Sequence, residues 1–203
     1  ALREQYRRAI AELRARRQEL LGQIRSWYDS QRGEVARWRS EMLGKARAWF
    51  NQASQQARAN YNAILDQLRA NYQRTRERLR AALQAARTEA AHMSRVQGFL
   101  YLAQAYRAYN EGMASAVLQY YRQRFQARLQ YEGQLLQIRL KYQQLRSQVY
   151  QQYYPAMEKV RTERKQREEQ VREQYYASYY EIRAWYYENY YKLRAQLWAR
   201  THA

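Results

Sequence analysis

The 203-residue chain is predicted to be all-α, with very long amphipathic helices arranged as a helical hairpin or an extended rod. An 11-residue repeat runs through most of the sequence, and the composition is dominated by Glu, Gln, Arg, Ala and Leu, which favour helix. One proline and six glycines leave little material for turns. The 22 tyrosines and five tryptophans argue against disorder, because disordered chains are poor in aromatic residues.

The repeat is clearest when each unit is numbered from a basic residue at position 1. Residues 47–50 read RAWF, and 58–61 and 69–72 both read RANY. The string REQY occurs at 3–6 and again at 172–175. Position 4 is usually aromatic, position 11 is nearly always apolar, and positions 7 and 8 are mixed. These spacings of 4, 3 and 4 fall within roughly 100° of arc, which indicates one face of an α-helix that is straight or winds slowly to the right.

Two rows of residues form the predicted interaction surface. The apolar and aromatic stripe comprises Trp27, Trp38, Trp49, Tyr61, Tyr72, Tyr120, Tyr131, Tyr142, Tyr175 and Tyr186. The basic edge comprises Arg25, Arg47, Arg58, Arg69, Arg80, Arg128, Arg139, Arg172, Arg183 and Arg194. Position 1 lies roughly 60–80° from the centre of the stripe, so these arginines are placed at the border of an apolar face.

The repeat changes phase once, where the step from Arg80 to Arg95 is fifteen residues instead of eleven. This divides the chain into a first helical array, residues 1–94, and a second, residues 95–203, with a hinge expected near 91–112.

Two structures are compatible with this phase change. Four extra residues around 91–94 make about one helical turn, so the helix could continue through them. Alternatively, the chain turns in the segment through Gly98 or at 110–112 and folds the arrays together. The hairpin is favoured, because two antiparallel amphipathic helices cover each other's stripes.

Two local irregularities lie in the second array. Pro155 should kink a helix at this point, but the repeat keeps its phase across it, which favours a kinked helix over a loop. Between residues 161 and 170 the stripe is lost, because Arg164, Arg167 and Glu168 take positions that are elsewhere apolar or aromatic. We interpret this stretch as solvated, with a hinge as the alternative.

The net charge of +19, from 37 basic and 18 acidic residues, favours partners with negative surfaces, such as anionic lipid, nucleic acid, acidic polysaccharide or an acidic protein. The absence of cysteine excludes disulfides and thiolate chemistry. No apolar run reaches the roughly 18 residues that a membrane span needs. The chain begins at Ala1 rather than methionine, as a processed form or a fragment would.

Residues for catalysis are sparse. His92 and His202 are far apart, and no phosphate-binding glycine motif or GxSxG sequence is present. The pair Glu168–Glu169 lies in a run of mixed charge, where a solvated helix face is the better interpretation. The sequence therefore predicts a protein that is not an enzyme and that has no cofactor and no metal site.

Tyrosine pairs are the most unusual feature of the second array. Tyr175–Tyr176 and Tyr186–Tyr187 are separated by eleven residues, and similar pairs occur earlier. One tyrosine of each pair can face the stripe, whereas its neighbour points about 100° away. Packing between helices is the favoured interpretation, and contact with a lipid–water boundary is the alternative.

The tandem units RAWF/RANY/RANY/RAAL at 47–83 and REQY/RAWY/RAQL at 172–197 resemble the 11- and 22-residue repeats of exchangeable apolipoproteins and of large lipid-transport proteins. The resemblance covers most of the chain and implies helices that lie along lipid surfaces, with basic side chains at the edge of the apolar face. It also implies an extracellular location. This chain departs from that family in having no proline between units and a narrow, tyrosine-rich stripe.

Two other functions are compatible with the same pattern. Rows of Tyr and Arg could assemble a structural coiled coil, rod or filament, in which the chain forms homo-oligomers or packs on other helices. The arginines could instead bind nucleic acid or another polyanion, although basic residues spread with period eleven form no single patch. Lipid binding is the first of these hypotheses because a known repeat family supports it.

Overall fold

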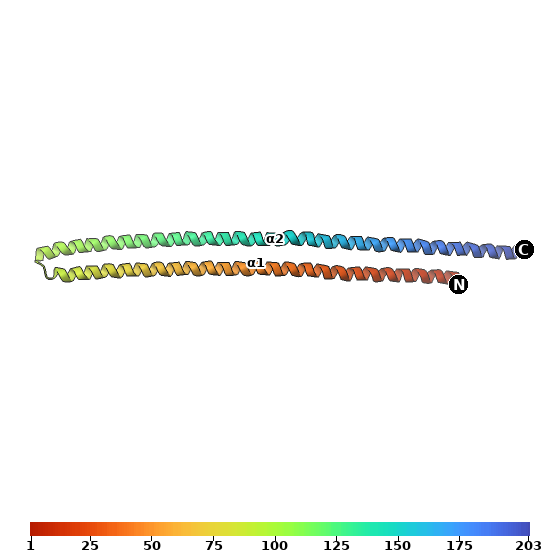
Figure 1. The fold of residues 1–203 in the computed structure, drawn as a ribbon, viewed down its shortest axis with the longest axis horizontal. Coiled ribbons are helices and arrows are strands. Elements are labelled where there is room, and N and C mark those ends of the chain that lie inside the picture. The colour runs from red at the N-terminus through yellow and green to blue at the C-terminus, as the bar shows by residue number, and fades with distance from the viewer. The chain divides into compact units, whose positions relative to one another are not determined.

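A computed structural model describes all 203 residues and contains two α-helices and no strand. Helix α1 spans Leu2–Ala90 and helix α2 spans Arg95–His202 (Figure 1). The predicted all-α class is therefore confirmed. Helix α2 passes through Pro155 without interruption, which agrees with a helix rather than a loop at this proline.

The two helices pack as two separate units. Unit 1 combines Ala1–Gly44 of α1 with Ser147–Ala203 of α2, and unit 2 is the continuous segment Lys45–Arg146. Unit 2 is an antiparallel helical hairpin that contains the turn between α1 and α2. In unit 1 the segments of α1 and α2 also pair in antiparallel fashion, because Tyr6 contacts Tyr186 and Arg39 contacts Tyr153.

The turn of the hairpin lies at residues 91–94, in the four-residue insertion itself. The amides of His92 and Met93 donate to the carbonyls of Glu89 and Ala90, which tightens the end of α1. Ser94 then caps α2, because its hydroxyl accepts a hydrogen bond from the Gln97 amide at 3.4 Å. The turn lies within the expected hinge region 91–112, in the segment that leads to Gly98. The alternative turn at 110–112 is wrong, because these residues lie inside α2.

Position 11 of the repeat forms the seam between the helices. Eight of the eleven buried apolar residues occupy this position. In unit 2 the buried residues at this position are the alanines Ala46, Ala57, Ala90 and Ala127. In unit 1 they are the larger residues Ile24, Val149, Val160 and Val171. Every salt bridge joins residues three or four apart on one helix. The helices are therefore held together by the seam and by the aromatic contacts described below, without ion pairs between α1 and α2.

Gly98 marks a close approach of the two helices beside the turn. A Cβ atom at Gly98 would lie 3.0 Å from the carbonyl oxygen of Ala90, whereas a Cβ at Gly133 would meet nothing within 4 Å. We expect Gly98→Ala to destabilise the protein by about 1 kcal/mol, because the crowding outweighs the gain in helix propensity.

Gly133→Ala is the matched control for this substitution. It removes a helical glycine in open space and should stabilise the protein by about 0.5–1 kcal/mol. Urea unfolding followed by circular dichroism measures both values. Equal shifts in the same direction for the two variants would contradict a close contact at Gly98.

Candidate interaction surface

Position 4 of the repeat pairs α1 with α2 at regular intervals. In unit 2 the ring centroids of Tyr61 and Tyr131 lie 4.6 Å apart, with an angle of 11° between the ring planes. Eleven residues away on each helix, the pairs Tyr72–Tyr120 and Phe50–Tyr142 have centroid distances of 5.0 and 4.9 Å. Such contacts stabilise by about 0.5–1.5 kcal/mol beyond the area they bury. We call each such pair a rung.

Unit 1 keeps this spacing but changes its chemistry. Tyr6 and Tyr186 form an aromatic rung at 4.5 Å. The next three rungs each place an arginine against a tyrosine ring, with distances from the guanidinium carbon to the ring centroid between 4.2 and 4.5 Å: Arg17–Tyr175, Arg164–Tyr28 and Arg39–Tyr153. Cation–π contact thus replaces ring stacking at the same position of the repeat.

The expected solvated stretch at 161–170 is part of this contact. Arg164 and Arg167 are half-buried and lie over the rings of Tyr28 and Trp27, at 4.3 and 3.9 Å. Arg164 also donates to Glu168 at 2.9 Å, and this bond raises the pKa of the Arg164 guanidinium. The solvated interpretation is wrong, because long arginine side chains can cover an aromatic face while their charged ends stay near water.

The arginines around Tyr28 lower the pKa of its hydroxyl. Partial desolvation acts to raise the pKa of its hydroxyl, but the guanidinium groups of Arg161, Arg32 and Arg164 lie within hydrogen-bonding reach and lower it below the ordinary value of 10.0. The contribution of this shift to stability therefore develops only at alkaline pH, once the tyrosine ionises, and is absent at neutral pH.

The predicted stripe lies at the contact between the helices. Its tyrosines at 61, 72, 120, 131, 142, 175 and 186 are half-buried in rungs. Trp27, Trp38 and Trp49 are also half-buried, and Trp49 packs against the Lys141 ammonium at 4.8 Å. The stripe tyrosines therefore contact the partner helix, whereas the three tryptophans remain partly exposed.

The predicted basic edge is exposed at every one of its ten arginines. The edges of the two helices meet on one side of each pair. Arg25 and Arg172 line the same groove in unit 1, and Arg58 and Arg139 line the same groove in unit 2. A second groove of unit 2, between residues 53–60 and 130–138, is lined by glutamine, asparagine, small residues and Ile138 and contains no charged residue.

A second apolar row lies on α2 and faces solvent. Apart from Ile64, all exposed large hydrophobic residues belong to α2. In unit 2 we define the outer row as Leu118, Tyr121, Phe125, Leu129, Leu136 and Leu140. These residues occupy positions 2, 5 and 9, which fall within roughly 70° of arc and lie roughly 140° from the seam. The arginines at position 1 lie between the seam and this row.

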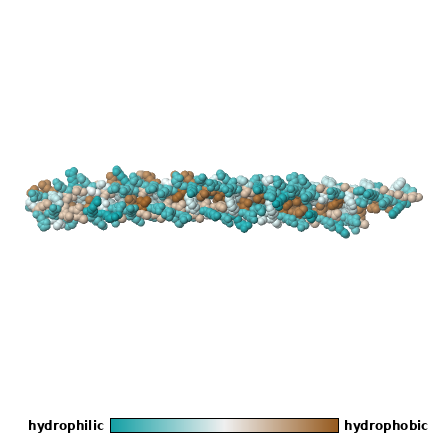
Figure 2. Space-filling model, in the orientation of Figure 1, coloured by the Kyte–Doolittle hydropathy of each residue, from teal (hydrophilic) through white to brown (hydrophobic).

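Tyrosines take the same positions in unit 1. The exposed residues Tyr154, Tyr176, Tyr180, Tyr187 and Tyr191 occupy positions 5 and 9 of their units. On the visible face of the molecule, separate apolar patches interrupt a mainly hydrophilic surface (Figure 2). Tyrosine pairs therefore serve two surfaces, since Tyr175 and Tyr186 lie in rungs whereas their neighbours Tyr176 and Tyr187 are exposed.

The sequence analysis did not find the arginines at position 4 of α1 or the outer row, and it interpreted Arg164 at position 4 of α2 as solvated. Stepping by eleven from Tyr6 lands on Arg17, Tyr28 and Arg39, so the alternation was visible in the sequence. The leucines at 118, 129 and 140 also recur at eleven. Both signals were missed because arginine was assigned only to an edge and only one stripe was sought.

No group of three or more His, Asp or Glu side chains converges as metal ligands would. Neither helix contains a stretch that is apolar enough over sufficient length to cross a membrane. Comparison with protein-family models, with curated proteins and with solved structures finds no match to this chain.

Proposed function

We propose that the protein binds anionic lipid surfaces peripherally, through the outer row of α2 and the arginines beside it. The observation that carries this proposal is the outer row itself, whose side chains remain about half exposed or more, with Phe125 at 63% and Leu140 at 51%. Contiguous apolar residues on a solvent-facing helix indicate an interaction site. Tyrosine and arginine beside leucine and phenylalanine are typical of helices that lie in a lipid–water interface.

Charge favours lipid over a second copy of the chain. The net charge is +19, and Arg128 and Arg139 flank the outer row on α2. Docking the same surface of another copy would bring like charges together, which is unfavourable. An anionic membrane supplies the opposite charge and attracts each nearby Lys or Arg by about 1 kcal/mol. The resemblance to apolipoprotein-like repeats points in the same direction, and it remains a hypothesis.

The test measures binding to vesicles of phosphatidylcholine that contain about 30% phosphatidylserine. We expect Phe125→Gln/Leu129→Gln/Leu136→Gln to weaken co-flotation roughly 100-fold, because each side chain loses about 1 kcal/mol of burial in the interface. Since the outer row is exposed in the free protein, the variant should keep the helix content of the parent protein.

A matched control places the same substitution on α1. Ala48, Ala59 and Ala70 are exposed at position 2 of their units, so Ala48→Gln/Ala59→Gln/Ala70→Gln should bind as the parent does. Unchanged flotation of the outer-row variant would overturn the proposal. A large change in the emission of Trp27, Trp38 and Trp49 on binding would indicate that the helices separate and expose the stripe instead. Concentration-dependent growth in size without vesicles, abolished in the outer-row variant, would assign the row to a second copy.

A further inference from the structure

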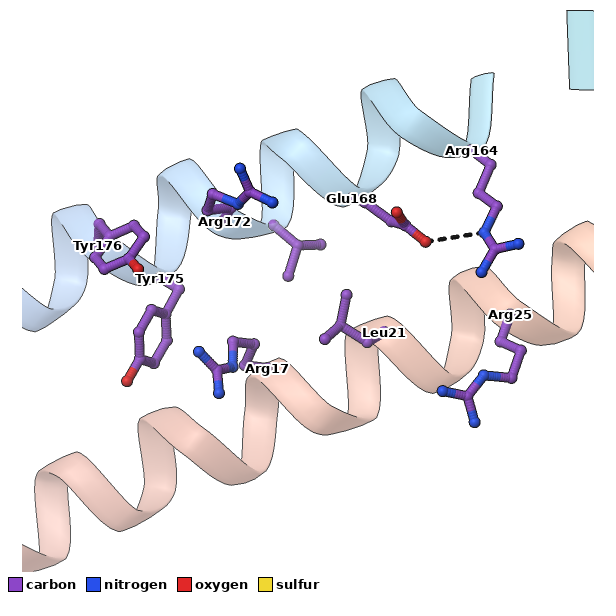
Figure 3. Close-up of a pocket in the computed structure, with 9 residues that line it drawn as sticks. Arg17, Leu21, Arg25, Arg164, Glu168, Arg172, Tyr175 and Tyr176 are labelled. Atoms are coloured by element: carbon purple, nitrogen blue, oxygen red, sulfur yellow. Dashed lines mark hydrogen bonds and ion pairs between the residues drawn. The ribbon is translucent and has the colours of Figure 1, made fainter. Parts of the chain in front are cut away.

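We propose that a groove in unit 1 is a binding site for a phosphoryl dianion. The groove lies between α1 and α2, where Arg17 and Arg25 come from α1 and Arg164 and Arg172 come from α2 (Figure 3). Its volume is about 350 Å³. The inference concerns a soluble or headgroup phosphate at one defined place and does not depend on lipid binding by the outer row.

The groove contains more positive charge than its own acidic groups balance. Four guanidinium groups line it, and Glu168 is the only carboxylate. That carboxylate is already engaged, because Arg164 donates to it at 2.9 Å. Arg17, Arg25 and Arg172 form no ion pair in the structure. A dianion would compensate most of this excess, whereas a single carboxylate would compensate less of it.

Arg17 provides a second, independent indication. Its guanidinium rests on the Tyr175 ring at 4.2 Å, and its Nε atom is buried without a hydrogen-bond partner. This is the only buried side-chain nitrogen or oxygen in the protein that lacks one. Buried polar groups are almost always satisfied, so the Arg17 guanidinium lacks an acceptor within the protein, and an anion in the groove would meet its terminal nitrogens because Nε itself has no exposed surface.

The shape of the groove suits a phosphate ester. In Figure 3, Arg17 and Arg164 extend into the space between the helices, while the side chains of Arg25 and Arg172, which also line the groove, lie across their own helices. A planar guanidinium group can donate two parallel hydrogen bonds to two oxygens of one phosphate. Several arginines around one groove can therefore bind different oxygens of the same phosphoryl group. Leu21 and Val171 form an apolar wall, and Tyr175 and Tyr176 border the groove. Unit 2 has a groove of similar volume, but only Arg58 and Arg139 line it with charge.

The experiment titrates the full chain with inorganic phosphate, at a pH where the dianion dominates and at constant ionic strength set with sodium chloride, and follows binding by calorimetry. We expect one site, whose affinity falls roughly tenfold or more in Arg25→Gln/Arg172→Gln, since each lost guanidinium removes a charge-assisted hydrogen bond. Both residues are exposed, so the variant should fold, and circular dichroism checks this.

The matched control is Arg47→Gln/Arg80→Gln, which removes two exposed position-1 arginines that line none of the grooves described here. This control should change the affinity less than about twofold. Equal losses in both double variants, or no binding beyond the effect of chloride, would overturn the site, because both results indicate only diffuse attraction by net charge.

Vesicles distinguish the two sources of the phosphoryl group. If the ligand is a headgroup, vesicles containing phosphatidic acid should bind more tightly than vesicles of equal charge containing phosphatidylserine, and only Arg25→Gln/Arg172→Gln should lose this preference. Binding of inorganic phosphate without such a preference assigns a soluble phosphate ester. A third outcome is vesicle binding that depends on the outer row, without binding of inorganic phosphate and without a preference for phosphatidic acid. This outcome supports lipid binding and overturns only the phosphoryl site.

Discussion

Replacing Val160 by aspartate is expected to destabilise unit 1 by about 3 kcal/mol or more. Val160 is buried in the seam. A carboxylate there would lose hydration and the apolar contacts of valine, which is among the most costly of single substitutions. Urea unfolding followed by circular dichroism should show a lower midpoint than in the parent protein. Because Val160 belongs to unit 1, the helical signal of unit 1 should be lost at lower urea concentration than that of unit 2.

Leu140→Asp is the control for this experiment. Leucine is the larger and more hydrophobic residue, so hydrophobicity in the sequence alone predicts the greater loss at Leu140. The structure predicts the opposite, because Leu140 faces solvent in the outer row. We expect a cost of less than about 1 kcal/mol, mainly from the lower helix propensity of aspartate. Similar costs at the two positions would contradict the assignment of position 11 to the seam.

The sequence predicted the helices and the seam because both depend on local periodicity. An 11-residue repeat fixes the face on which apolar residues fall, and Val149, Val160 and Val171 were recognisable as one row from their spacing alone. The change of phase also marked the region of the turn. The division at 94/95 coincides with the start of α2. The sequence did not decide between a turn at 91–94 and a continuous helix, because a four-residue insertion fits one more helical turn as well as it fits a break.

The partner of the stripe was harder to predict, because periodicity does not say what covers an apolar face. The tyrosines at 61 and 131 were assigned to a surface for lipid, and the structure packs them on each other. Position 4 of α1 faces position 4 of α2 only if the chain turns at a particular residue. The repeat pattern of the sequence does not show which distant residues face each other, so it does not show that the tyrosines pair.

The outer row was hidden by its similarity to the rungs. Position 4 and the outer row both hold large side chains with period eleven, so together they make α2 look apolar around much of its circumference. Only the exposure of Phe125 and Leu136, beside the burial of Ala127, separates the two faces. On α1 the equivalent positions hold alanine, glycine and polar residues, and this asymmetry directs attention to α2 as the helix that meets a partner.

A substitution series at Tyr61 tests whether a rung accepts ring stacking and cation–π contact alike. Tyr61→Ala should destabilise unit 2 by about 3 kcal/mol, because it leaves the half-buried Tyr131 ring uncovered next to an alanine seam. Tyr61→Arg should cost about half as much, since the same position of the repeat holds Arg17 and Arg39 over tyrosine rings in unit 1. Tyr61→Phe retains the stacked ring and should cost less than about 1 kcal/mol.

The second half of this test removes the ring that the new arginine would cover. The cycle compares Tyr61→Arg and Tyr61→Ala, each with and without Tyr131→Ala. Removing the ring at position 131 should cost more when position 61 is arginine than when it is alanine, and this difference reports the cation–π contact. Unfolding free energies of the four proteins in one cycle give this coupling. A coupling near zero, or equal costs for Tyr61→Arg and Tyr61→Ala, would mean that the arginine rungs of unit 1 are only solvated charges at the edge of the seam. A favourable coupling of about 1 kcal/mol would establish that one position of the repeat holds two helices together with either chemistry, which explains how the chain carries its arginines into a helix contact without ion pairs.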